Sequence, residues 1–353
     1  MSESTICVSV ILPVYNSRDY IQDAVESILQ QTLKELELIV IDDASTDGTQ
    51  AIIRQFDDSR IVFIQKEKNT GYTQSLNRGL GIAKGEYIAR MDADDISLPG
   101  RLERQVAFLN ANPDMIFCGT DFEIMGTPRK VLKGFFTHEQ IITAMLLYTP
   151  VIHPTVMFRG DFIRKNNIRY DPSFEPSEDF ELWVRLAGQG KIAIIPEVLL
   201  KYRHHSEQVS SKADELQQSN LRRSRIRLLS YLTGPLAGKE QEYAEMLFGS
   251  RNVNGKEELR NLFKWVDRII QFNDTSPYFL KDLFRNYLFQ LRKKVVKKSF
   301  LGRSKYTMSD IPDLLFASRH IKKDLGFWDG LKYIIKSIFF WRSRKEKNRF
   351  VHQ

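Results

Sequence analysis

Short β-branched runs alternate with helical patterns over the first third of the chain, and this alternation limits the possible folds more than any other feature. Apolar, β-branched runs predict strands at residues 8–14, 36–41, 61–65, 87–91 and 115–118. Between them, helical patterns predict helices near 19–31, 49–56, 72–83 and 101–110. Strands that alternate with helices in this way form βαβ units with a parallel sheet.

The rest of the chain divides into two regions of different character. Residues 126–203 have a mixed pattern, with helices near 139–147 and 181–187 and a strand near 155–158. After Ser210 come long amphipathic stretches rich in Leu, Arg, Lys and Phe, without strand alternation. The sequence therefore predicts one α/β domain over residues 1–212 and a mainly helical region over 213–353, with a boundary near Lys212.

Formal charge is distributed unevenly between these two regions. The whole chain has a net charge of +8, but residues 213–353 hold 29 Lys and Arg against 15 Asp and Glu, a net of +14. Residues 1–212 therefore carry a net of −6. An acidic region suits a bound metal ion and a basic one suits an anionic surface, so we expect the two regions to have different partners.

Three features favour the cytosolic side of a membrane. The first apolar run is short, contains Pro13 and has no basic stretch before it, which is typical of a strand rather than a signal peptide. No stretch approaches the roughly 18 to 20 apolar residues of a membrane-spanning helix. Cys7 and Cys118 each lie in an apolar run, which favours buried free thiols in a reducing compartment.

The run Asp92-Ala93-Asp94-Asp95 follows the predicted strand that ends at Met91. Three carboxylates in four residues repel one another, and a strand end offers little to offset this repulsion unless a cation is bound. Mg²⁺ typically bridges one or two carboxylates to substrate phosphates. The alternative interpretation is a solvated acidic turn before the helix that follows Pro99, and for an isolated cluster that alternative would be favoured.

A second acidic pair, Asp42-Asp43, ends another predicted strand. Ligands of open α/β sheets bind beyond the carboxyl ends of the strands, where carboxylates accept hydrogen bonds from ribose hydroxyls or a base N–H. Tyr15 and Asn16 follow the first strand at the same edge. These positions predict a nucleotide site next to the acidic cluster.

Five segments in order resemble glycosyltransferase family 2, whose members are inverting enzymes of the GT-A fold. They are VSVILPVYN, LIVIDDASTDGT, KNTGYTQSLNRGLGIAKGEYIARMDADD, HPTVMFR and SEDFELWVRL, and they cover roughly residues 6–210. Each segment alone is a weak signal, whereas their joint order and spacing are highly specific. The resemblance implies a bacterial cell-surface polysaccharide enzyme with a Rossmann-like mixed sheet, which binds nucleotide-sugar in about 1–120 and acceptor in about 121–212.

The resemblance also implies roles for individual residues of the donor site. Pro13, Tyr15 and Asp43 would line the nucleobase pocket, with Asp43 accepting from the base N–H. Asp94 would be the principal ligand of Mn²⁺ or Mg²⁺ at the donor diphosphate, and Asp92 would lie near the ribose or the metal. Asp95 would support the loop. The resemblance favours a UDP-sugar as donor.

An acceptor hydroxyl is a poor nucleophile at neutral pH, so a positioned carboxylate is expected to remove its proton. Glu178-Asp179 precedes a helical pattern and resembles the acidic pair of the family in which the aspartate is the base, so Asp179 is assigned that role. Alternatively, Ser177, Glu178 and Asp179 only cap the helix and complement its dipole, and the two interpretations are compatible because a helix N-terminus favours an ionised carboxylate.

Two histidines match recurrent histidines of the family. His153 opens His153-Pro154-Thr155 on the acceptor side, where a contact with substrate and a structural role are equally open. His205 ends Tyr202-Arg203-His204-His205 and is a candidate third metal ligand, since neutral imidazole binds metal. Against this, hard Mg²⁺ prefers oxygen ligands.

Residues 327–350 combine eleven apolar or aromatic side chains with seven Lys and Arg. This composition is typical of an interfacial helix at an anionic membrane, and it predicts a peripheral protein on the inner face of the cytoplasmic membrane. The acceptor is expected to be a glycan or a lipid-linked glycan. The alternative is a helical subdomain that packs on the catalytic domain and exposes a solvated basic face.

Two other functions remain open on the sequence. A sugar-1-phosphate nucleotidyltransferase also uses an α/β sheet, carboxylates and Mg²⁺, but it carries a glycine-rich basic loop where this chain has Tyr15-Asn16-Ser17-Arg18. A non-enzymatic nucleic-acid-binding protein would explain the basic region and leave the acidic one unexplained. We therefore expect no nucleic-acid partner.

Overall fold

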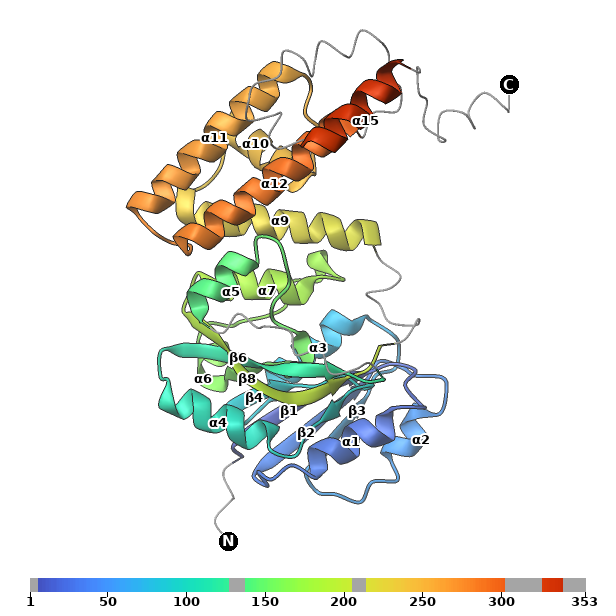
Figure 1. Cartoon of the computed structure of the whole chain (residues 1–353). Coiled ribbons are helices and arrows are strands. Elements are labelled where there is room, and N and C mark those ends of the chain that lie inside the picture. Colours follow the sequence, from blue (N-terminus) through green and yellow to red (C-terminus); the bar gives the residue numbers. More distant parts are fainter. Residues whose placement is uncertain (1–5, 127–136, 205–213, 302–325, 339–353) are drawn as a thin grey trace, which may run out of the picture. The chain divides into compact units, whose positions relative to one another are not determined.

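The computed structural model describes residues 6–126, 137–204, 214–301 and 326–338 (Figure 1). The chain forms two compact units, Met1–Ser224 and Arg225–Gln353, and the division falls within helix α9 (Asp214–Thr233). The boundary predicted near Lys212 lies outside the described residues.

The first unit is built on an eight-stranded sheet with the order β3-β2-β1-β4-β7-β6-β8-β5. Strands β1 (Val8–Val14), β2 (Leu36–Asp42), β3 (Ile61–Gln65) and β4 (Tyr87–Arg90) run parallel, as the βαβ pattern predicts. Every residue of β1 and β2 is buried, because helices cover both faces of this half of the sheet. The parallel ladder brings the ends of these strands to one edge.

Helices pack on both faces of this sheet. Helices α1 (Ile21–Leu29) and α4 (Arg101–Ala111) cover one face, where Val10 and Leu12 of β1 join the main apolar cluster (Figure 1). Helix α3 (Tyr72–Ile82) approaches β1 so closely that a Cβ at Gly79 would lie 2.5 Å from the side chain of Ile11. Because successive side chains of a strand point to opposite faces, Ile11 places α3 on the other face from α1.

The second half of the sheet is mixed. Strand β7 (Met157–Arg159) runs antiparallel to β4 and to β6 (Met115–Ile124), whereas β8 (Lys191–Tyr202) runs parallel to β6 and antiparallel to β5 (Ile96–Ser97). The expected strand 155–158 begins later, because His153–Thr155 forms a 3₁₀ turn. Three further helices belong to this half: α5 (His138–Ala144), α6 (Gly160–Lys165) and α7 (Glu178–Ala187); the short α2 (Thr49–Ile53) belongs to the first half.

Within its described residues, the second unit contains helices and no strand, as the sequence predicts. After the end of α9 come α10 (Gly238–Phe248), α11 (Lys256–Thr275), α12 (Lys281–Leu301) and α15 (Phe327–Ile338). Buried side chains recur along α11 at helical spacing, among them Leu259, Leu262, Val266 and Ile270. No helix in the described parts of the chain is both long enough and apolar enough to span a membrane.

Candidate active site

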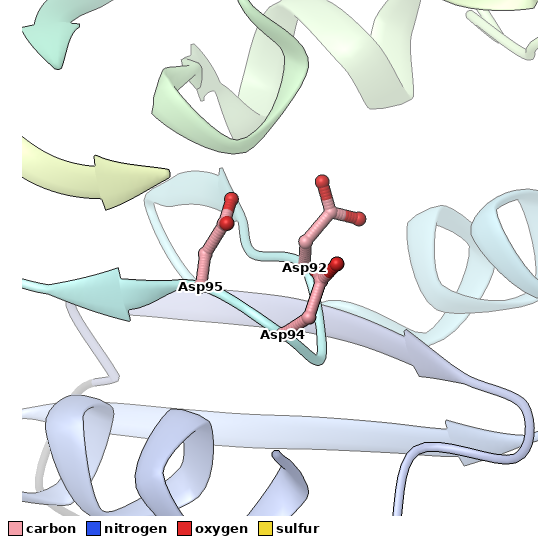
Figure 2. Close-up of side chains that lie close together, drawn as sticks. All are labelled: Asp92, Asp94 and Asp95. Carbon is pink, nitrogen blue, oxygen red and sulfur yellow. The ribbon is translucent and has the colours of Figure 1, made fainter. Parts of the chain in front are cut away.

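The acidic cluster lies in the loop between β4 and β5. Asp92, Asp94 and Asp95 each offer an oxygen, and these oxygens all lie within 4.8 Å of one another. Figure 2 shows the three carboxylates raised to the same side of the loop. The chain turns at Ala93 and Asp94 directly after β4, and this turn brings the three carboxylates together.

Burial distinguishes the three carboxylates from one another. Asp92 and Asp94 are half-buried, whereas Asp95 is only 1% exposed. Asp95 Oδ1 accepts a hydrogen bond from the backbone N–H of Arg203 (2.8 Å), and Asp95 Oδ2 is buried without a partner among the described residues. Burial, and then the charges of Asp92 and Asp94, raises the pKa of Asp95 to about 8.

Arg203 holds this loop from the end of β8. Besides the bond to Asp95, its Nε donates to the carbonyl oxygen of Asp94 (2.8 Å). Its guanidinium stacks over the ring of Tyr20, 4.7 Å from the ring centre. The loop conformation is therefore fixed by a residue more than a hundred positions further along the chain.

Arg90, the last residue of β4, is a buried cation beside the cluster. Its Nη2 forms an ion pair with Asp92, while Nε and Nη1 are buried without a hydrogen-bond partner in the described structure. The guanidinium carbon lies 5.4 Å from the ring centre of Tyr72, whose hydroxyl donates to Asp92 (3.3 Å). Two unpaired buried N–H-bearing atoms indicate a place where water or a ligand would bind.

A second pair of carboxylates stands at the start of α7. Burial, and then the charge of Asp179, raises the pKa of Glu178 to about 8, and Glu178 Oε2 is buried without a partner among the residues described. Burial raises the pKa of Asp179 to about 6, against the opposing effects of the Phe180 N–H, which donates to Asp179 Oδ1 (2.6 Å), and of Arg90. Ser177 does not cap α7 with its side chain.

The two carboxylate groups act on each other electrostatically. The charge of Asp92 contributes to the raised pKa of Asp179, and the charge of Arg90 lowers the pKa of Asp95, Glu178 and Asp179. Side-chain contacts support this: Tyr72, whose hydroxyl donates to Asp92, contacts the ring of His153, which contacts Trp183 of α7, so α7 and the β4–β5 loop border a common region. Sequence analysis did not identify Arg90, although a single arginine at the end of an apolar strand before three aspartates is a readable signal.

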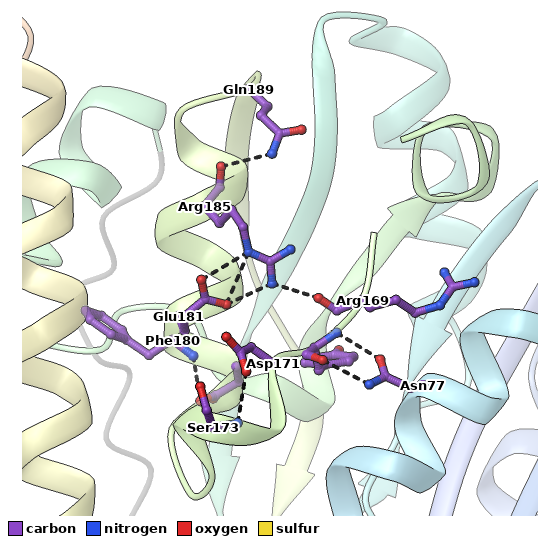
Figure 3. Close-up of polar contacts among 10 residues, drawn as sticks. Asn77, Arg169, Asp171, Ser173, Phe180, Glu181, Arg185 and Gln189 are labelled. Carbon is purple, nitrogen blue, oxygen red and sulfur yellow. Dashed lines mark hydrogen bonds and ion pairs between the residues drawn. The ribbon is translucent and has the colours of Figure 1, made fainter. Parts of the chain in front are cut away.

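A polar network fixes the segment that leads into α7 (Figure 3). Arg185 Nη2 donates to Glu181 (2.8 Å) and to the carbonyl oxygen of Arg169 (2.7 Å). Asn77 of α3 exchanges two hydrogen bonds with the backbone of Tyr170 (2.8 and 2.9 Å). Through the segment 169–170, these contacts connect α7 to α3 and so fix the position of Asp179 at the start of α7.

His153 lies in the wall of this region. Its Nε2 hydrogen-bonds with the Tyr170 hydroxyl (2.8 Å), and its ring contacts those of Tyr72 and Trp183 at 6.3 and 5.6 Å between centres. Burial, and then the charge of Arg90, holds the pKa of His153 well below its usual value, so the ring is neutral. These contacts account for its position as a packed side chain.

The predicted nucleobase residues lie at the end of β1 and β2. Pro13 is buried in β1 opposite Ile41, and Tyr15 just beyond the strand is 49% exposed. Asp43 is buried and accepts from the N–H groups of Thr70 and Gly71 (both 2.9 Å).

Lys66 adds an ion pair with Asp43 Oδ1 (2.6 Å), so both oxygens of Asp43 already have protein donors. A carboxylate offers about four acceptor positions, which leaves room for one further donor such as a base N–H. The remaining candidate ligand, His205, lies outside the described residues.

The three-carboxylate cluster fits a hard divalent cation. Its donors are oxygens, two of them half-exposed, and the buried Asp95 Oδ2 lacks a partner within the described structure. Arg90 neutralises only part of this negative charge through Asp92. The donor set is therefore of the kind that Mg²⁺ or Mn²⁺ accepts.

An open mixed sheet with carboxylates beyond the fourth strand defines the class of GT-A nucleotide-sugar transferases. The family described as "Glycosyl transferase family 2" matches residues 9–171. An uncharacterized glycosyltransferase of Haemophilus influenzae is 34% identical over 242 residues, which cover 65% of this chain and 75% of that protein. The chain belongs to glycosyltransferase family 2.

Two further proteins show what similar chains do. The Escherichia coli protein WfaP, a UDP-Glc:α-D-GlcNAc-diphosphoundecaprenol β-1,3-glucosyltransferase, is 35% identical over 222 residues, 62% of this chain and 86% of WfaP. The crystal structure of Staphylococcus aureus TarS 1–349 in complex with UDP-GlcNAc aligns with a TM-score of 0.55 at 18% identity, over 94% of this chain and 91% of that one.

These similarities confirm the predicted family, the GT-A fold and the enzyme class. The chain is a glycosyltransferase, so the alternatives of a nucleotidyltransferase and of a non-enzymatic nucleic-acid-binding protein were wrong.

Proposed function

We propose that this enzyme transfers a sugar, with inversion, from a UDP-sugar to a hydroxyl of a lipid-linked glycan. The observation that carries the proposal is the cluster of Asp92, Asp94 and Asp95 oxygens within 4.8 Å of one another, with Asp92 paired to Arg90, whose charge also lowers the pKa of Asp179. The cluster suits the donor diphosphate and Asp179 suits proton removal from the acceptor. Such a pairing is what direct displacement at the anomeric carbon requires.

On the donor side, Asp94 and Asp92 would hold Mn²⁺ or Mg²⁺, with His205 as a further candidate ligand. The cation would stabilise the negative charge that develops on the departing diphosphate. Pro13 and Tyr15 would flank the base, and Asp43 would accept from its ring N–H. The UDP-Glc in the name of WfaP and the UDP-GlcNAc bound in the TarS structure support this choice of nucleotide.

On the acceptor side, Asp179 would act as the general base. A base works best when its pKa lies near the working pH, and the pKa of about 6 keeps Asp179 ionised at neutral pH while retaining basicity. Glu178, with a pKa of about 8, would remain protonated beside it. One ionised and one neutral carboxyl avoid the repulsion of two adjacent charges.

We further propose that the enzyme acts at the inner face of the cytoplasmic membrane. In α15, Trp328, Leu331 and Ile335 are exposed (77%, 39% and 47%) at the spacing of one helical face, and exposed Lys332 accompanies them. An apolar stripe with basic neighbours suits the boundary of an anionic bilayer. The lipid-linked acceptor named for WfaP supports the same location.

A panel of nucleotide-sugars with and without Mn²⁺ tests the donor assignment. We expect UDP release only with UDP-sugars, and at a rate that falls when the metal is chelated. GDP or dTDP release in its place would overturn the choice of nucleotide. Deletion of residues 327–353 should move the protein from the membrane pellet to the supernatant, and unchanged partitioning would contradict membrane attachment.

A further inference from the structure

The helical unit contains a cavity of about 580 Å³ that is far in sequence from every residue of the active site. It lies among the end of α10, the connection 249–255, the start of α11 and the last turns of α12. Gly249 and Gly255, at φ of 85° and 91°, bound this connection, and other residues rarely adopt this backbone conformation. The cavity is therefore formed entirely by helices of this unit and by the connection between two of them.

The charge of the cavity wall has a single sign. Four basic residues line it, Arg251, Lys256, Lys294 and Lys298, and no Asp or Glu is among the lining residues. Lys294 and Lys298 are four residues apart on α12, so they share one face of the helix, and both are exposed. Their ammonium groups can therefore reach one ligand together.

The floor of the cavity is apolar. Met246, Leu247, Phe248, Leu259, Val295 and Phe300 line it and are buried. Asn252, Asn254 and Ser299 also line the cavity and add polar groups, whereas the six buried apolar side chains offer no donors to the oxygens of a small, hydrated anion. A ligand with an anionic head and an apolar body satisfies both the rim and the floor.

The cavity also adjoins the helix proposed above for membrane contact. Phe300, which lines it, packs edge-to-face on Tyr333 of α15 at 5.2 Å between ring centres. Lys297, which directly precedes Lys298 in α12, forms an ion pair with Asp329 of α15 (2.7 Å). The basic rim and the apolar stripe of α15 therefore belong to one packed set of helices.

We propose that this cavity binds the phosphate headgroup of an anionic membrane lipid. Lys294 and Lys298 contact the phosphate, and the apolar floor receives the first part of the lipid's hydrocarbon. This inference rests on the part of the proposed function that brings the chain to an anionic membrane. It does not depend on the donor, the metal or the general base.

The test compares two double variants that remove the same charge. Lys294→Gln/Lys298→Gln removes the paired lysines of the cavity, and Lys264→Gln/Lys293→Gln removes two exposed lysines of α11 and α12 that do not line it. Flotation with vesicles of phosphatidylglycerol mixed into phosphatidylcholine measures the affinity of each. We expect the cavity variant to bind about tenfold or more weakly, and the control variant to lose less than about threefold.

Each other outcome overturns the proposal. Equal losses in both variants would mean attraction by overall charge without a specific cavity. Displacement of vesicles by millimolar inorganic phosphate, with matching affinity for phosphate alone, would mean a free-anion site. Unchanged binding of the cavity variant, combined with loss on deletion of 327–353, would leave membrane attachment intact and refute the cavity. Thermal unfolding of both variants checks that these exposed substitutions leave the fold unchanged.

Discussion

Close carboxyl groups repel one another in two places, Asp92–Asp95 in the loop after β4 and Glu178–Asp179 at the start of α7. In both places burial keeps one carboxyl protonated and so lowers this repulsion. Each contains one fully buried carboxyl whose pKa burial raises to about 8, Asp95 in one and Glu178 in the other. Each also contains more exposed members, Asp92 and Asp94 in the first and Asp179 in the second. The buried member of each group holds its proton near neutral pH.

The groups differ in what stabilises their ionised members. In the loop, Asp92 has an arginine and a tyrosine hydroxyl within reach, and the cluster has space for a cation. At α7, the N–H groups of Phe180 and of Asp179 itself, together with the charge of Arg90, stabilise the ionised Asp179. A weakly stabilised carboxylate is a better base and a strongly stabilised cluster is a better metal site. This difference supports Asp179 as the proposed base and Asp92 and Asp94 as the proposed metal ligands.

Replacing the proposed base should give the largest effect. Asp179→Asn is expected to lower the rate of sugar transfer by about 100- to 10 000-fold, the usual contribution of general-base catalysis. Donor affinity, measured by titration of UDP with Mn²⁺, should change by less than about threefold, because the substitution leaves the donor side intact. Transfer at near-normal rates would place the base elsewhere.

Replacing the proposed metal ligand should weaken donor binding as well as turnover. Asp94→Asn is expected to lower kcat/KM by about 100- to 1000-fold, since a bound cation supplies several kcal/mol of charge stabilisation. The loss should appear as weaker metal-dependent binding of UDP. Asp161→Asn serves as the control, because Asp161 is an exposed carboxylate of α6. Metal-independent UDP binding of equal strength in the wild-type enzyme would contradict the role of Asp94.

Much of the parallel half of the sheet could be predicted from the sequence, and much of the mixed half could not. Strands β1 and β3 match the expected ranges because both are short segments rich in Val and Ile that are followed by polar residues. Strand β8 was not predicted, because Pro196 and Glu197 interrupt its apolar pattern. In the ladder with β6 the register passes from Ile195 directly to Val198, so this pair is accommodated as an irregularity. Two-residue β5 is too short for any periodicity.

The candidate site shows the same limit. Local sequence identifies Asp92, Asp94 and Asp179 as candidates because acidic residues at a strand end or helix start form a visible pattern. Arg90 is readable next to the acidic run, but its effect on Asp179 of α7 arises only from the fold. Arg203 depends on contacts with the β4–β5 loop, which precedes it by more than a hundred residues. The burial that raises the pKa of Glu178 also arises from tertiary packing, so its protonation state was not readable from sequence.

Arg90 provides a sharper test of the link between the two groups. Because its charge lowers the pKa of Asp179, Arg90→Met should raise that pKa and shift the acidic limb of the kcat/KM profile to higher pH by about one unit. At pH 7 we expect a loss of only about twofold, because about half of the base is still ionised, and at about pH 5 the loss should approach tenfold. Arg90→Lys keeps the charge and should keep the limb near its original pH. If the acidic limb of the kcat/KM profile stays at its original pH in Arg90→Met, the charge of Arg90 does not connect the two carboxylate groups.

The smallest effect concerns stability and tests the protonated state of Glu178. Its pKa in the folded protein, about 8, is above the ordinary value of 4.5, so the folded state binds the proton more tightly than the unfolded state. Stability should therefore be unaffected below about pH 4.5 and should decline as the pH rises toward 8. Glu178→Gln cannot ionise and should remove this decline, raising the free energy of unfolding at pH 8 by about 1 kcal/mol or more. Thermal unfolding at pH 5 and pH 8 measures the difference, with Glu257→Gln in the exposed first turn of α11 as the matched control. If the decline in stability persists in Glu178→Gln and matches that of the control, Glu178 is not the source of the decline and is not held protonated. The two carboxylate groups would then not share a buried, protonated member.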